Sequence, residues 1–172
     1  DRADGEGVRA AAARLDPAVR IQFGREVVRA GDVAVLSPGI PPSASAYRIA
    51  HRVADEVIGE MELFFRLFPG TVVAVTGTDG KSTTTTLIAH LLRAAGRNAV
   101  AAGNLGNPVC DLVPELGPDD VVVAEVSCFQ LLTCSRFRPR VAVVTNLAED
   151  HIEHHGSFEA YVRAKALVLA RQ

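Results

Sequence analysis

Short, continuous apolar runs alternate along the chain with polar turns and with segments that have a helical period. Four of these runs, at 71–76, 98–102, 121–126 and 141–145, are predicted to be strands. Strands that are buried on both faces are apolar throughout, whereas half-exposed strands alternate apolar and polar residues. The helical segments between the runs, which include a short helix over 109–116, would cover the two faces. The pattern therefore predicts an α/β fold with a parallel sheet.

The residues before this sheet form a separate block. A short strand is expected over 32–36, ended by the rigid turn 37–42, and a helix from about Ser43. A brief strand over 57–59 and a helix over 60–68, with an apolar stripe at Leu63, Phe64 and Leu67, complete the block. Helical periodicity is weak over 8–15. Pro69 and Gly70 break the pattern strongly, and a domain boundary is predicted there or slightly before.

The first strand of the sheet runs directly into the glycine turn 77–82, and an apolar-periodic segment through Leu87, Leu91 and Ala95 follows. This order of strand, glycine turn and helix suits a phosphate, because the backbone N–H groups of the turn and of the helix N-terminus converge on an anion. Lys81 adds a mobile positive charge, and Ser82 adds a hydroxyl that can reach Mg²⁺. Valine replaces the first glycine of the eight-residue P-loop pattern, so the prediction of a nucleotide triphosphate site depends on this context.

Polar residues also follow the other predicted strands. In open parallel sheets, ligands bind outside the carboxyl ends of the strands. Asn104 lies between two glycines after the second strand, Glu125 lies in the third, and the segment 146–151 follows the fourth. A buried carboxylate must be neutralised, paired or bound to a metal. A buried arginine is one partner for Glu125, but Mg²⁺ beside a phosphate site is the better one.

Two residues near the end of the chain have open interpretations. His151 lies at the mouth of the same crevice and is either a metal ligand, a substrate contact or a solvated histidine, whereas His154 and His155 are expected to be solvated. Ser157 is a good N-cap, and Lys165 falls on one helical face with Phe158, Val162 and Leu169. Such a lysine either extends to solvent or, if it is held inside, becomes a reactive amine.

Composition narrows the class of protein. The chain has 172 residues, 48% of them hydrophobic, and a net charge of −2, which gives no reason to expect nucleic acid or a membrane surface as a partner. No apolar run approaches a membrane span, and no signal-peptide pattern is present. The three cysteines have no CxxC spacing, which favours a reducing compartment. Cys128 is interpreted as a small buried hydrophobic residue and not as a nucleophile, since no histidine is near it in sequence.

The motifs GTDGKSTTT, GNLGNP, EVSCFQL and NLAEDH, in this order and with these separations, resemble the Mur ligases of peptidoglycan synthesis. The resemblance covers about residues 32–170. The stretches SPGI and SCFQL, and the segment 146–151 followed by Arg163, Ala164 and Lys165, are closest to the member that adds D-glutamate to UDP-N-acetylmuramoyl-L-alanine. Cys128 stands where serine is usual in the family, a change that should be tolerated.

The resemblance implies ATP-driven amide formation, in which the substrate carboxylate attacks the γ-phosphate and the acyl phosphate is captured by the amine of D-glutamate. Lys81, Glu125, His151 and Lys165 would be catalytic. Ser82 and Glu125 would hold one Mg²⁺, and His151 would hold a second together with Lys165 converted to a carbamate by CO₂. Asn104, Ser127 and His151 would contact the substrate, and Ser37, Pro38 and Gly39 would lie near its uridine diphosphate. The phosphates of ATP would be cradled by Gly77, Thr78, Asp79, Gly80, Lys81, Ser82, Thr83 and Thr84.

The resemblance also implies that the chain is partial. Residues 1–68 would belong to a Rossmann-like N-terminal domain for the UDP-substrate, and residues 69–172 would be the first part of the central P-loop-type ATPase domain. The C-terminal domain, which supplies the D-glutamate site, would be absent, so these residues alone are expected to be inactive. A monomeric, cytoplasmic protein is expected.

Two other functions stay open. The first is another Mur-type or folylpolyglutamate-type amide ligase, against which SPGI and SCFQL argue. The second is a nucleotide-binding module without catalysis. Lys81, Glu125, His151 and Lys165 argue against it, because such a module needs no such set.

Overall fold

The computed structural model describes residues 13, 16–20, 22, 27–106 and 108–172. The periodicity over 8–15 lies outside these residues, apart from Ala13. The chain divides into two compact units, one formed by 1–34 with 40–56 and the other by 35–39 with 57–172. The domain boundary near Pro69 stays a prediction.

In the first unit, the described part contains helix α2 (Ser45–Val53) and a turn held by two aspartates. Asp32 Oδ2 accepts a hydrogen bond from Arg29 N, and Asp55 Oδ1 accepts one from Gly31 N, both at 2.8 Å. Strands β1 (Val33–Leu36) and β2 (Glu56–Gly59) form a two-stranded sheet. The predicted strand, helix and strand of this region are confirmed.

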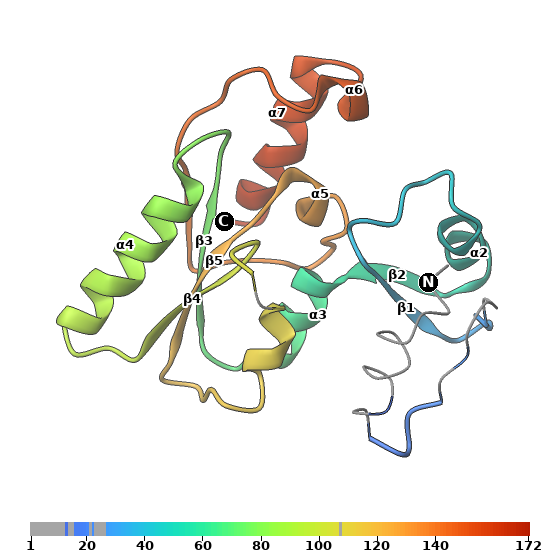
Figure 1. Ribbon diagram of the computed structural model, residues 1–172, viewed down its shortest axis with the longest axis horizontal. Helices are drawn as coiled ribbons and strands as arrows, with labels where there is room; N and C mark the ends of the chain where they lie inside the picture. The colour runs from blue at the N-terminus through green and yellow to red at the C-terminus, as the bar shows by residue number, and fades with distance from the viewer. Residues whose placement is uncertain (1–12, 14–15, 21, 23–26, 107) are drawn as a thin grey trace. The chain divides into compact units, whose positions relative to one another are not determined.

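The second unit is built on a four-stranded parallel sheet with the order β4-β5-β3-β6 (Figure 1). Its strands are β3 (Thr71–Thr76), β4 (Ala99–Gly103), β5 (Val121–Glu125) and β6 (Val141–Val144). Its α-helices are α3 (Glu60–Leu67), α4 (Lys81–Ala94), α5 (Cys128–Leu131), α6 (Ile152–His155) and α7 (Phe158–Ala166). Two 3₁₀ helices, η1 (Val109–Leu112) and η2 (Leu167–Leu169), complete the unit. The parallel sheet predicted from the apolar runs is confirmed.

Successive residues of the central strands face opposite sides of the sheet, and each side has its own core. Val73 and Val75 of β3 pack with Ala89 of α4, while Val72 and Ala74 pack with a larger cluster that includes Phe64 of α3. Both faces of the strands are therefore buried, which explains their unbroken apolar sequence. No helix in the described part of the chain is long and apolar enough to cross a membrane.

Three expected helical details are wrong. Leu87 and Leu91 of α4 are 53% and 57% exposed, and the buried positions are Thr85 and Ala89, whose small side chains let the helix lie close to the sheet. The stripe on α3 is shifted in the same way, since Met61 and Phe64 are buried and Leu67 is 54% exposed. The helix expected over 109–116 is only η1, which ends at Leu112 although Val113 keeps a helical backbone conformation.

The Glu62 side chain, on α3, is fully buried and joins this helix to the loop 135–137. Its carboxylate accepts hydrogen bonds from the backbone N–H groups of Ser135, Arg136 and Phe137, at 3.1, 2.9 and 2.9 Å. Arg66, one turn later, donates from Nε to Oε1 at 2.8 Å. A buried carboxylate is tolerated here because its oxygens are satisfied by backbone donors and one guanidinium.

We expect Glu62→Gln to lower the free energy of unfolding by about 1–3 kcal/mol, since the amide replaces one acceptor oxygen by a donor that faces other donors. Denaturant titration of this variant measures the change. Glu115→Gln, which alters an exposed glutamate, is the control and should leave the midpoint unchanged. An unaltered midpoint for Glu62→Gln would contradict the assigned role of the network.

Candidate functional site

The carboxyl ends of all four parallel strands lie at one edge of the sheet. Glu125 of β5 is in register with Gly103 of β4 and with Val75 of β3, and Thr76 of β3 is in register with Val144 of β6. The segments that follow the strands therefore begin side by side at this edge. The glycine turn, Asn104, Glu125 and the loop after β6 all belong to it, as the sequence predicts.

The glycine turn has two positions whose backbone conformation favours glycine. Gly77 has a φ of 144°, and a Cβ atom built on it would overlap Thr145 Oγ1. Gly80, at the N-cap of α4, is in the left-handed region with a φ of 74°. The first residues of a helix have N–H groups without intrahelical partners, which here belong to Gly80, Lys81, Ser82 and Thr83. These groups and the positive end of the helix dipole make the turn suited to an anion.

The loop after β6 holds the turn in shape. Asn146 O accepts a hydrogen bond from Thr78 N at 3.1 Å, and Asn146 Oδ1 accepts one from Asp79 N at 2.9 Å. Thr145 Oγ1 donates to Asp79 O at 2.7 Å. The N–H groups of Thr78 and Asp79 are thus engaged by protein. The available donors are those of the helix N-terminus, a refinement of the predicted cradle of eight residues.

Lys81, on the first turn of α4, folds back over the turn. Its Nζ donates to Thr78 O at 2.6 Å, and the residue is half-buried. A flexible cationic side chain at this point can exchange the carbonyl for the oxygen of a phosphate, as the sequence predicts.

Glu125 forms a polar cluster with Ser82 and Asn104. It is 2% exposed, and its two carboxylate oxygens accept separate hydrogen bonds, from Ser82 Oγ at 2.6 Å and from Asn104 Nδ2 at 2.9 Å. Gly103 makes this proximity feasible, since a Cβ atom there would overlap the main-chain oxygen of Glu125. Ser82, Asn104 and Glu125, which were predicted to lie at one edge of the sheet, are thus brought together. Among the described residues, no arginine pairs with Glu125.

The donor atoms of this cluster suit Mg²⁺. A serine hydroxyl and a carboxylate oxygen, adjacent to each other at the N-terminus of the helix that follows the glycine turn, are hard ligands of the kind that this ion prefers. Among the described residues, no group of three or more His, Cys, Asp or Glu side chains is arranged to hold a metal. Any Mg²⁺ at this point would therefore depend on phosphate oxygens and water for its remaining ligands.

Lys165 points inward from α7, which decides between the two interpretations of its position. It is 3% exposed, its Nζ donates to Gly77 O at 2.7 Å, and Nζ lies 4.6 Å from the centroid of the Tyr161 ring. Burial lowers the pKa of its amine below the ordinary value for lysine. The buried face of α7 consists of Tyr161, Ala164 and Lys165, so the expected face with Val162 and Leu169 is wrong in part, and Leu169 is 48% exposed.

His151 lies near Tyr161 without touching Glu125 or Ser82 in any recorded contact. Its side chain is 44% exposed, its ring centroid is 6.5 Å from that of Tyr161, and its Nε2 lies 3.4 Å from Asp150 Oδ2. It has a positive φ of 52° at the N-cap of α6. His151 and Lys165 thus both lie near the Tyr161 ring, although the two side chains do not contact each other directly.

The expectation that His155 is solvated is wrong. Its ring stacks on Phe129 with centroids 5.4 Å apart, and its Nε2 lies 3.3 Å from Cys128 Sγ. Partial burial lowers the pKa of His155 and raises that of the Cys128 thiol. Cys128 is 1% exposed, which agrees with its interpretation as a small buried residue. His154, 62% exposed, is solvated as expected.

The remaining predicted residues have local roles in the structure. Ser37, Pro38 and Gly39 form an exposed turn after β1, with no recorded contact to the Glu125 cluster in the part described. Ser127 is the N-cap of α5, where its Oγ accepts from Gln130 N at 3.2 Å. A substrate contact by any of these residues stays a prediction.

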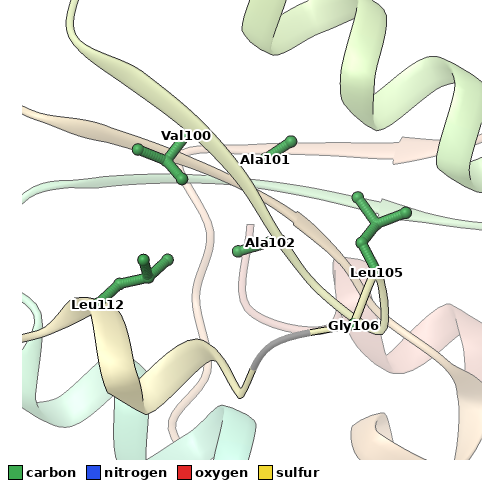
Figure 2. A pocket seen from close by; sticks show the side chains of 6 residues that line it. All are labelled: Val100, Ala101, Ala102, Leu105, Gly106 and Leu112. Atoms are coloured by element: carbon green, nitrogen blue, oxygen red, sulfur yellow. The ribbon is translucent and has the colours of Figure 1, made fainter.

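A pocket of about 260 Å³ lies beside the loop that carries Asn104. Figure 2 shows Val100 and Ala102 of β4 near Leu112 of η1, and Leu105 on the loop. The pocket is lined by Val100, Ala101, Ala102, Leu105, Gly106 and Leu112. None of the predicted site residues lines it.

The fold and the site define an α/β domain with a P-loop-type phosphate turn at the carboxyl edge of a parallel sheet. Residues 75–172 match the Mur ligase middle domain. A UDP-N-acetylmuramoylalanine–D-glutamate ligase from Pelotomaculum thermopropionicum is 48% identical over 141 residues, and one from Salinibacter ruber is 44% identical over 171 residues. The chain belongs to the Mur ligase family.

These matches cover 82% and 94% of the chain, but only 31% and 37% of the two relatives. The chain thus spans about a third of their length. Among solved structures, the MurF ligase from Thermotoga maritima in complex with ADP has a TM-score of 0.52 at 23% identity, covering 84% of this chain and 41% of that one. A UDP-N-acetylmuramoyl-L-alanyl-D-glutamate–2,6-diaminopimelate ligase has a TM-score of 0.50. These two likenesses concern the fold.

Proposed function

We propose that this chain is part of an ATP-dependent amide ligase that adds D-glutamate to UDP-N-acetylmuramoyl-L-alanine. The observation that carries the proposal is the contact of Ser82 with the buried Glu125 at the N-terminus of α4, directly beside the glycine turn. This arrangement would supply an anion site and two metal ligands at one point, which supports the proposal. The names of the relatives support the choice of acceptor and amino acid.

In the proposed mechanism, the helix N-terminus and Lys81 bind the phosphates and stabilise the negative charge on the transferring phosphoryl group. ATP would supply that group to the substrate carboxylate, and Mg²⁺ would neutralise the developing charge. Ser82 and Glu125 would hold one ion. Asn104 keeps the Glu125 carboxylate oriented through its hydrogen bond, and its exposed position allows it to meet the substrate as well.

Lys165 is proposed to react with CO₂, losing one proton and forming a carbamate that, with His151, would hold a second Mg²⁺. The reaction requires a neutral amine, and burial at Lys165 lowers the pKa of the amine in that direction. A carbamate would also provide the anionic oxygens that a lysine lacks. The common neighbour of Lys165 and His151, the Tyr161 ring, supports their assignment to one site.

Phosphate release by the full-length protein tests the proposed function. With ATP, Mg²⁺ and UDP-N-acetylmuramoyl-L-alanine, release should require D-glutamate, and mass spectrometry should find the amide product. L-alanine and a diamino acid are the matched alternatives. Release with a diamino acid and not with D-glutamate would assign another ligase of the family, and the absence of ATP binding would refute the proposal.

We expect Lys165→Ala in the full-length protein to lower kcat by about 100-fold or more, because the ligand of a catalytic metal is lost. Short carboxylates such as formate should restore part of the activity by replacing the carbamate. Arg163→Ala, on the exposed side of the same helix, should retain full activity. Unchanged activity of Lys165→Ala would remove the carbamate from the mechanism.

A further inference from the structure

Tyr161 occupies the junction between α7, the glycine turn and the loop after β6. It is 0% exposed, and its hydroxyl lies 3.0 Å from Thr78 Oγ1 in the turn. Lys165 Nζ lies 4.6 Å from the centroid of the Tyr161 ring, and the centroids of the Tyr161 and His151 rings are 6.5 Å apart. The Tyr161 side chain thus contacts the glycine turn and Lys165, and it lies near His151. Lys165 and His151 are the two proposed ligands of the second metal.

The Thr78 hydroxyl has three hydrogen-bond contacts, two to Ala148 and one to Tyr161. Thr78 Oγ1 accepts from Ala148 N at 3.0 Å and donates to Ala148 O at 3.2 Å, which uses its single proton. A hydroxyl oxygen has one further acceptor position. The arrangement that uses all three contacts has the Tyr161 hydroxyl donating to Thr78, and the threonine side chain is satisfied by protein atoms.

This saturation changes the role of Thr78. Its hydroxyl is directed at the loop and at α7, so it is not available to a phosphate, and its N–H donates to Asn146 O. Thr78 is therefore the point at which the turn is fastened. The backbone of Ala148 binds the Thr78 hydroxyl to the loop after β6, and the Tyr161 side chain binds it to α7, the helix that carries Lys165.

We propose that Tyr161 is a positioning residue of the ligase reaction. Its hydrogen bond to Thr78 would fix the glycine turn relative to Lys165, whose amine lies over the tyrosine ring. The inference rests on the proposed function. Loss of the hydroxyl would leave the turn free to shift against α7, while the phenyl ring would still fill the core. Nucleotide binding would weaken although the fold is kept.

Tyr161→Phe in the full-length enzyme tests the proposal, because it removes the hydroxyl alone. The KM for ATP should rise about three- to tenfold, the range expected for one hydrogen bond. The KM for D-glutamate and the folded fraction, followed by circular dichroism, should stay the same. Tyr47→Phe changes the other tyrosine of the chain, on α2, and is the control. A residue with only a structural role would lower the amount of active enzyme, and hence kcat, without a change in any KM.

A double-mutant cycle with Thr78→Val adds a second test. Since both residues act through one hydrogen bond, Tyr161→Phe should raise the KM for ATP by less than about twofold in the Thr78→Val background. Independent, multiplicative effects, or an unchanged KM for ATP in Tyr161→Phe, would overturn the inference while the wild type still makes the amide. An inactive wild type would instead refute the proposed function.

Discussion

Glu125→Gln in the full-length protein should lower kcat about 10²- to 10³-fold, the loss expected when one preorganised electrostatic group of an active site is removed. The amide has no negative charge for Mg²⁺, and its NH₂ group can face Ser82 or Asn104 only by giving up an acceptor oxygen. Glutamine has nearly the same shape as the glutamate that it replaces at this position, which is 2% exposed, so the fold should be retained. Phosphate release at saturating Mg²⁺ measures the effect.

The affinity for Mg²⁺ provides a second readout for this variant. The concentration of Mg²⁺ at half-maximal rate should rise in Glu125→Gln and not in Glu115→Gln, whose side chain is exposed and remote from the turn in sequence. If the two variants have the same rate and the same dependence on Mg²⁺, Glu125 is a structural hydrogen-bond acceptor and does not hold a metal.

Gly77→Ala should abolish measurable nucleotide binding, which corresponds to a loss of affinity of about 100-fold or more. The added methyl group would overlap Thr145 Oγ1, and a φ of 144° is unfavourable for alanine. Relief requires the loop after β6 to move, and this loop holds the turn through Asn146. Isothermal titration with ADP measures the effect.

Two glycines provide controls for this variant. Gly80→Ala meets no atom within 4 Å and suffers only the left-handed conformation, so a smaller loss is expected. Gly117→Ala has an ordinary contact with Asp120 and no positive φ, and it should bind as well as the wild type. Equal binding by the Gly77 and Gly117 variants would mean that the turn tolerates a different shape from the one described.

Sequence patterns predicted the local elements of the site well. The strand, the glycine turn and the helix of 71–94 are encoded by neighbouring residues, and the structure confirms each of them. The meeting of Glu125 with Ser82 also followed from sequence, because a parallel sheet places all carboxyl strand ends at one edge. This inference needed the direction of the strands but not the packing of side chains.

The contacts that support the site were not predictable in this way. Tyr161 reaches Thr78 across 83 residues, and Glu62 reaches the loop 135–137 across more than 70. In sequence each is an ordinary residue of an amphipathic helix. The position of His155 beside Cys128, across 27 residues, is of the same kind, since nothing in the local sequence of either residue specifies the other.

By itself, the sequence determined the class of fold, the edge of the sheet at which the candidate site lies, and the polar residues gathered there, because these depend on chain direction and local hydrogen bonding. The tertiary structure decided which helix faces are buried, that Lys165 points inward, and that the loop after β6 and Tyr161 fasten the glycine turn. Such outcomes depend on which side chains from distant segments fill the same volume, and a periodic pattern does not specify that choice.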